Sequence, residues 1–161
     1  MTNQQQLDVL RQGADAWNAW RKAHLDAKPD LNEIDLSNID LTEADLSTAN
    51  LSGSKLNSTK LSGADLSWAS LVGADLSGAD LSKANLNGTD LSGANLTSAD
   101  LRDTDLSQAT LIDTNFIAAN LSRADLSDAD THGAFFKEAD LRGAIITQEQ
   151  LNQAQSPDNI P

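Results

Sequence analysis

The sequence predicts an all-β solenoid, in which the chain winds around one long axis and turns a corner once every five residues. Leu, Phe or Ile occupies 22 of the 23 positions at steps of five from 36 to 146, and Thr131 is the exception. Two residues before these positions the residue is mostly small, and it is Ala sixteen times. Five residues of α-helix turn through about 500°, and a flat strand alternates its faces, so neither places such leucines in one interior. The repeat is therefore a unit of coiling.

The repeat A-(D/N)-L-S-x, as in ADLSGADLSKANLNG at 74–88, resembles the pentapeptide repeat family over residues 34–146. The resemblance implies a right-handed quadrilateral β-helix with one pentapeptide per side and about 20 residues per coil. At about 4.8 Å per coil, a β-helix over 29–146 has about six coils and is roughly 28 Å long. The Asp or Asn before each leucine and the Ser or Thr after it are expected to face solvent and make turn hydrogen bonds.

We expect an N-terminal helical cap over residues 1–28, because an uncovered first coil would leave backbone groups unpaired. Apolar side chains at helical spacing predict one amphipathic helix over 3–25, with a capping box between Thr2 and Gln5. The segment AWNAWRKA at 16–23 is similar to the N-terminal element of cyanobacterial pentapeptide proteins. Trp17 and Trp20 in this segment are interpreted as packing residues.

Residues 147–161 are expected to close the other end of the rod. Thr147 and Gln150 stand in capping-box relation and predict the start of a short C-terminal helix, and beyond Ser156 we expect a loose tail. Thr131 places a hydroxyl at a core position, where burial without a partner costs about 1–3 kcal/mol. We expect the hydroxyl to need a partner and Phe136 to fill the space left underpacked.

Composition predicts one domain in the cytoplasm. The chain has 161 residues and no cysteine, which excludes a disulfide framework and a thiolate zinc site. The N-terminal MTNQQQLDVL lacks the basic and apolar regions of an export signal, and no stretch has the roughly 20 apolar residues of a membrane span. The net charge of −13 disfavours nucleic acid and anionic membranes as partners and favours a basic protein surface.

The acidic residues are not expected to be catalytic, since the repeat itself places most of them. A catalytic carboxylate pair needs two groups in different environments, whereas these recur in one environment. His24 and His132 have no His or Cys neighbour at metal-ligand spacing, and the glycine-rich nonapeptide of calcium-binding β-rolls is missing. We expect no enzyme activity, no cofactor and no resident metal, while loose Ca²⁺ binding along stacked aspartates stays open.

Sorting the repeats by position modulo twenty gives four sides of unequal charge. The sides centred on Leu36 and on Leu41 mix acidic and basic residues, whereas the next two sides carry no Lys or Arg. We call the outward aspartates of these two adjacent sides the acidic edge, and we predict that this edge binds the partner. The acidic edge consists of Asp45, Asp65, Asp105, Asp125 and Asp128 on one side and Asp90, Asp113 and Asp130 on the other.

Two hypotheses for function follow. In the first, the chain is a non-enzymatic protein-binding or scaffold module, with further candidate contacts at the outward apolar residues Trp68, Val72, Ile112 and Ile117. In the second, the acidic edge mimics DNA and binds DNA gyrase, as the resemblance to pentapeptide proteins associated with quinolone resistance implies. Those proteins dimerise through an apolar C-terminal end, whereas Phe135, Ile145 and Leu151 here are explained by packing under the closing helix. We expect a monomer, with an end-to-end dimer through the C-terminal coil as the alternative.

Overall fold

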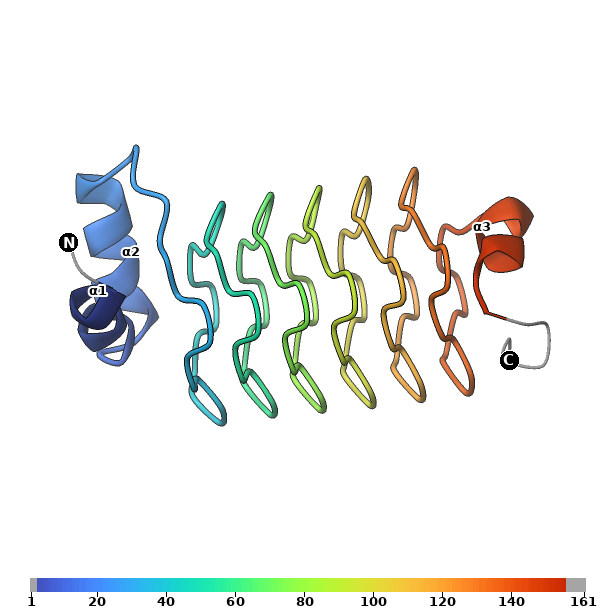
Figure 1. The fold of residues 1–161 in the computed structure, drawn as a ribbon, viewed down its shortest axis with the longest axis horizontal. Helices are drawn as coiled ribbons and strands as arrows, with labels where there is room; N and C mark the ends of the chain where they lie inside the picture. Colours follow the sequence, from blue (N-terminus) through green and yellow to red (C-terminus); the bar gives the residue numbers. More distant parts are fainter. Residues whose placement is uncertain (1–2, 156–161) are drawn as a thin grey trace.

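The computed structural model of the chain describes residues 3–155. A stack of coils forms a rod with helices at both ends (Figure 1). The N-terminal end carries α1 (Asn3–Leu10) and α2 (Ala14–Ala23), and the C-terminal end carries α3 (Gln148–Gln153). Between these helices a turn and a single bridging residue alternate along the chain from Asp30 to Ile145.

The coils stack in parallel at a constant separation of 20 residues. Parallel β-bridges join Asp30 to Asn50 and continue in the same register up to the pair Asp125 and Ile145. Successive bridges lie five residues apart, which gives each coil four sides. Each bridge uses only the residue before the buried leucine, so a side is a short segment between two corners rather than a long strand.

The interior of the rod is filled by one leucine-type residue and one small residue from each side. Leu36 and Leu66 are examples of side chains that are almost fully buried, and each such leucine contributes about 1.5–3 kcal/mol. Where Thr replaces Ala at the small position, its hydroxyl is satisfied by a carbonyl of the preceding coil, as in the 2.8 Å bond from Thr59 Oγ1 to the Leu36 carbonyl. Phe116 and Phe136, one coil apart, stack with their ring centroids 5.2 Å apart.

The N-terminal cap consists of two helices, so the prediction of one helix over 3–25 was wrong. The chain turns at Gly13, whose φ of 104° is a conformation that other residues rarely adopt. Leu7, Leu10 and Trp17 enter the core from both sides of this break, and their continuous helical spacing produced the error. Thr2 of the predicted capping box lies outside the described residues, and so does the segment beyond Ser156 that was expected to form a tail.

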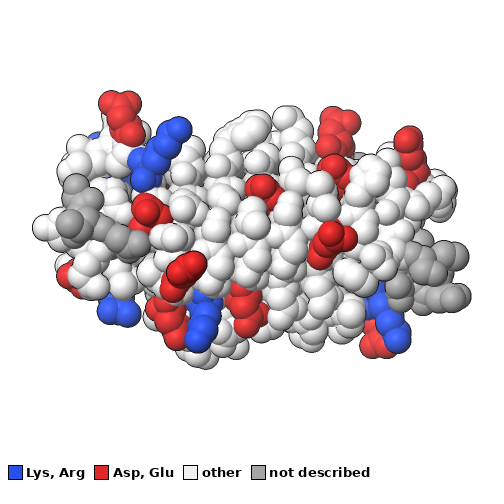
Figure 2. Space-filling model, in the orientation of Figure 1, with Lys and Arg blue, Asp and Glu red and all other residues white. Residues whose placement is uncertain are grey.

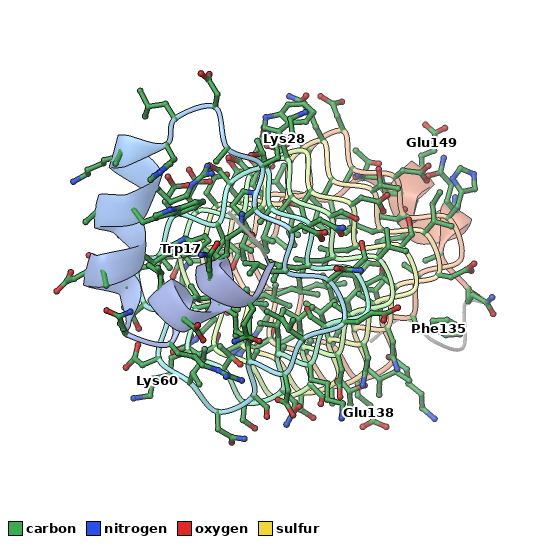
Figure 3. All side chains as sticks on the ribbon, turned by 60° about the vertical axis from the view of Figure 1, so that its left-hand side comes forward. Trp17, Lys28, Lys60, Phe135, Glu138 and Glu149 are labelled. Carbon is green, nitrogen blue, oxygen red and sulfur yellow. The ribbon has the colours of Figure 1, made fainter. Side chains whose placement is uncertain are left out.

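Side chains of α2 bind backbone groups of the first coil that a preceding coil would otherwise bind. Asn18 Oδ1 accepts a hydrogen bond of 2.7 Å from the Asp45 N–H, and Trp17 Nε1 donates to the Asp45 carbonyl at 2.6 Å. Arg21 Nη2 donates to the Ser47 carbonyl at 3.0 Å. One coil later the same three backbone groups bind backbone partners of the preceding coil. Figure 3 shows Trp17 reaching from the helices toward the rod, and the predicted packing role of this residue is confirmed.

Helix α3 closes the other end mainly through Gln150. The predicted capping box is confirmed, because the Gln150 N–H donates to Thr147 Oγ1 and the Thr147 N–H donates to Gln150 Oε1. Gln150 Nε2 donates to the carbonyls of Leu126 and Ala129 in the last coils, at 2.6 and 3.0 Å. Thr131 Oγ1 donates to the Gln150 carbonyl at 2.7 Å. The expectation that this buried hydroxyl needs a partner is therefore confirmed.

Candidate functional site

Aspartates that precede a leucine are turn residues. Oδ1 of Asp65 accepts a hydrogen bond of 2.9 Å from the Ser67 N–H, two residues later. The same contact recurs along the acidic edge at Asp45, Asp90, Asp105, Asp125 and Asp130. The turn engages Oδ1, which leaves Oδ2 as a potential acceptor for another donor. The expected turn hydrogen bonding is confirmed, and it explains why the repeat selects Asp or Asn.

Asp113 and Asp128, also members of the acidic edge, occupy a different position in the repeat from the turn aspartates. Both occupy the last position of their repeat, where the backbone is left-handed, with φ of 54° and 58°. Asp128 lines a depression beside Thr147 and Glu149 at the closing helix. These two aspartates add charge to the edge without making the turn contact described above.

The side centred on Leu41 pairs four of its five aspartates with Lys or Arg in the described part of the chain, and we call it the paired side. Among residues 3–155, every ion pair between a Lys or Arg of the coils and an Asp lies on this side. The four pairs are Lys60 with Asp40 at 3.4 Å, Arg102 with Asp100 at 2.5 Å, Arg123 with Asp103 at 2.6 Å and Arg142 with Asp140 at 2.5 Å. The hydrogen bond from Arg142 is the main reason that the pKa of Asp140 falls to about 2.

The acidic edge receives only two basic side chains, one Arg and one His, within the described part of the chain. Arg21 of α2 reaches Asp45 with 3.3 Å between Nε and Oδ2, and His132 contacts Asp130 within its own turn at 2.5 Å. Burial acts to raise the pKa of Asp45, but hydrogen bonds from Ser47 and the charge of Arg21 outweigh burial and lower it. Asp45 is therefore engaged by the protein itself, which sorting by side did not reveal, because Arg21 lies outside the repeats.

On the face shown in Figure 2, acidic side chains are scattered along the rod and basic ones are fewer. No described helix is long and apolar enough to cross a membrane. Within residues 3–155, no three His, Cys, Asp or Glu side chains gather in an arrangement that could hold a metal ion.

The outward apolar residues differ in how far they are exposed. Trp68 is 62% exposed, Val72 and Ile112 are 39% and 38% exposed, and Ile117 is only partly exposed. Trp68 adopts φ of 57° and its ring lies over Gly88 in the next coil, since a Cβ at residue 88 would come within 2.7 Å of the ring. The lack of a side chain at Gly88 therefore leaves the space that the indole occupies.

Two exposed apolar residues were not predicted. Ile145 is 58% exposed, so the expectation that it packs under the closing helix was wrong. It takes the outward bridging position opposite Asp125, one residue before the inward Ile146. Leu25 is 82% exposed in the link that follows α2. The predicted helix over 3–25 included Leu25, whereas α2 ends at Ala23.

The register, the turns and the stacked interior define a β-solenoid with charged flat sides. The chain belongs to the pentapeptide repeat family, whose model matches eight copies of the repeat across residues 28–57, 59–97, 89–128 and 119–154. Membership of this family implies a right-handed β-helix, in agreement with the parallel bridges between residues 20 apart.

Several solved pentapeptide repeat proteins are similar to this chain. HetL, involved in heterocyst differentiation regulation in the cyanobacterium Nostoc, is 32% identical, with 83% of this chain and 72% of HetL covered and a TM-score of 0.34. A protein from the thylakoid lumen of Arabidopsis thaliana is 34% identical, with 70% and 68% covered and a TM-score of 0.28. The protein alr5209 from Nostoc is 29% identical, with 86% and 93% covered and a TM-score of 0.32. No curated protein matches the chain in sequence.

Proposed function

We propose that this chain is a non-enzymatic protein-binding module whose acidic edge docks on a basic protein surface. The observation that carries the proposal is a difference in charge pairing between neighbouring sides of one rod. Within the described residues, the paired side supplies Lys or Arg to four of its five aspartates, whereas the repeats of the acidic edge supply none. A basic partner is the chemistry that complements such a surface.

The stacking of like charges supports the same proposal. Asp105 and Asp125 are direct bridge partners, as are Asp45 and Asp65. Like charges directly opposite each other destabilise a sheet, and a basic partner would relieve this repulsion. The surface is also held in place by turn hydrogen bonds and by helices at both ends, so docking would cost little ordering of the rod.

The test compares two variants with equal loss of charge in a pull-down eluted with a salt gradient. The edge variant replaces Asp65, Asp105 and Asp125 by Asn, and the control variant replaces Asp35, Asp75 and Asp80 by Asn on the mixed sides. Asn already occupies this turn position at Asn85 and Asn95, so both variants keep the turn acceptor. We expect a basic partner to be captured by the wild type and the control and to be lost from the edge variant. Equal capture by both variants would overturn the proposal.

Gyrase is the specific partner that the second hypothesis names. Gyrase subunits in the eluate, together with inhibition of supercoiling by the wild type but not by the edge variant, would assign the acidic edge to DNA mimicry. A different basic protein in the eluate, with supercoiling unaffected, would support the binding module and reject the mimic.

A further inference from the structure

Trp68 is the most exposed aromatic residue described, and it is held in a defined place. Its ring lies against the backbone of Gly88, where a Cβ would approach Cε3 within 2.7 Å. The left-handed backbone at Trp68, with φ of 57°, is uncommon for a bulky residue. The outer face of the indole is thus presented to solvent on a side whose repeats contain no Lys or Arg.

The molecule itself shows how an arginine binds this side. Arg21 Nε lies 3.3 Å from Asp45 Oδ2 while Asp45 Oδ1 keeps the turn contact with Ser47. Arg21 Nη2 also lies 3.1 Å from Ser47 Oγ. The aspartate and serine of one repeat therefore accept a guanidinium without losing the turn.

The next coil repeats this acceptor set and adds the aromatic ring. Asp65 and Ser67 are the residues one coil after Asp45 and Ser47, and Asp65 Oδ1 again holds the turn. In the described part of the chain no donor is bonded to Asp65 Oδ2. Trp68 follows directly, and its ring leans toward Gly88, two residues before Asp90.

We propose that Trp68 and Asp65 form an arginine-selective contact for a basic protein segment, with the guanidinium stacked on the indole and bonded to Asp65 Oδ2. This inference rests on the proposed function of the acidic edge and names its central contact. Arginine fits better than lysine, because a planar, weakly hydrated guanidinium stacks on an aromatic face and binds a carboxylate at the same time. Phosphate-bearing partners are repelled by the net charge of −13.

The test measures binding of oligo-arginine and oligo-lysine peptides of equal length by calorimetry, and follows the Trp68 indole N–H by NMR. Trp68→Gln removes the ring without changing charge, and Gln108 already occupies the equivalent position two coils later with φ of 59°. Leu25→Ser is the control for loss of another exposed apolar residue, outside the acidic edge. We expect the wild type to prefer arginine by about two- to fivefold, Trp68→Gln to abolish this preference, and Leu25→Ser to keep it.

The outcomes separate this inference from the proposed function. An unshifted Trp68 indole, or an arginine preference retained in Trp68→Gln, would overturn the inference. If the variant with Asp65, Asp105 and Asp125 replaced by Asn then binds both peptides more weakly than its matched control, the acidic edge still stands as a basic-partner surface. If both triple variants bind as well as the wild type, the proposed function fails as well.

Discussion

The paired side and the acidic edge have the same backbone and the same turns, yet they differ in whether the repeat pairs its aspartates with basic residues. On the paired side, the residues after the leucine include Arg102 and Arg142, which bind the aspartate of their own turn. On the acidic edge, the corresponding residues are small or neutral, as at Ser67 and Ser107. The turn thus requires the aspartate, whereas the neighbouring residues determine whether its charge is paired. The variable positions of the repeat, rather than its consensus, therefore determine where negative charge stays unpaired.

The largest expected effect is the loss of Arg21, which binds the acidic edge at Asp45. Arg21 is 7% exposed and also donates to the carbonyls of Ala27 and Ser47. Arg21→Ala should lower the free energy of unfolding by about 2–3 kcal/mol, a value reduced for the partial exposure of Asp45. At about 2–4 °C per kcal/mol, calorimetry should show a clear fall in Tm. Lys60→Ala is the control on the paired side, and a similar fall there would contradict the distinction between the two contacts.

A second expected effect concerns the support of the Trp68 ring. Gly88→Ala and Gly93→Ala both place Ala at φ near +65°, which costs roughly 1–2 kcal/mol. Only at Gly88 does the new Cβ meet the ring, while nothing lies within 4 Å of a Cβ at Gly93. We expect Gly88→Ala to be the more destabilising variant in urea unfolding and to change the fluorescence of Trp68. Equal stability and unchanged fluorescence would show that the ring does not lie on Gly88.

Removing one aspartate from each region should have smaller effects, which stabilise the fold only on the acidic edge. Asp105→Asn relieves repulsion with Asp125 and should stabilise the fold by about 0.2–1 kcal/mol at low salt. Asp100→Asn relieves repulsion with its bridge partner Asp80, but it leaves Arg102 without its carboxylate and should not stabilise the fold. Chemical unfolding at low and high salt measures both, since salt screens the repulsion at Asp105. Stabilisation by both variants would mean that net charge, rather than pairing, controls stability.

The smallest effect is a local pKa change on the paired side. Arg142→Gln should raise the pKa of Asp140 from about 2 toward its ordinary value of 3.8, because the hydrogen bond from the guanidinium is the main cause of the low pKa. Since the folded pKa is the lower one, this carboxylate stabilises the fold above pH about 4, and the contribution fades as pH falls toward 2. NMR titration of the Asp140 carboxyl measures the shift. An unchanged pKa in Arg142→Gln would assign the low value to the turn N–H instead.

The repeat could be predicted from the sequence because the five residues of each pentapeptide determine its local conformation. The leucine and the small residue point inward, the aspartate accepts the turn N–H, and the last residue takes the left-handed conformation. The capping box of Thr147 and Gln150 is equally local. Trp68 could likewise be identified as an outward residue, because its place within the five-residue period determines its direction.

Only the tertiary structure shows which distant groups meet. The break at Gly13, the use of Asn18 and Arg21 as substitutes for a missing coil, and the bond from Thr131 to Gln150 depend on how segments outside the repeat lie against it. The ring of Trp68 over Gly88 is a contact between coils, and the engagement of Asp45 is a contact between a helix and a coil. Periodicity gives the direction of a side chain because direction depends on the local backbone. The partner of that side chain depends on packing between segments that are not neighbours in sequence, and local pattern holds no information about it.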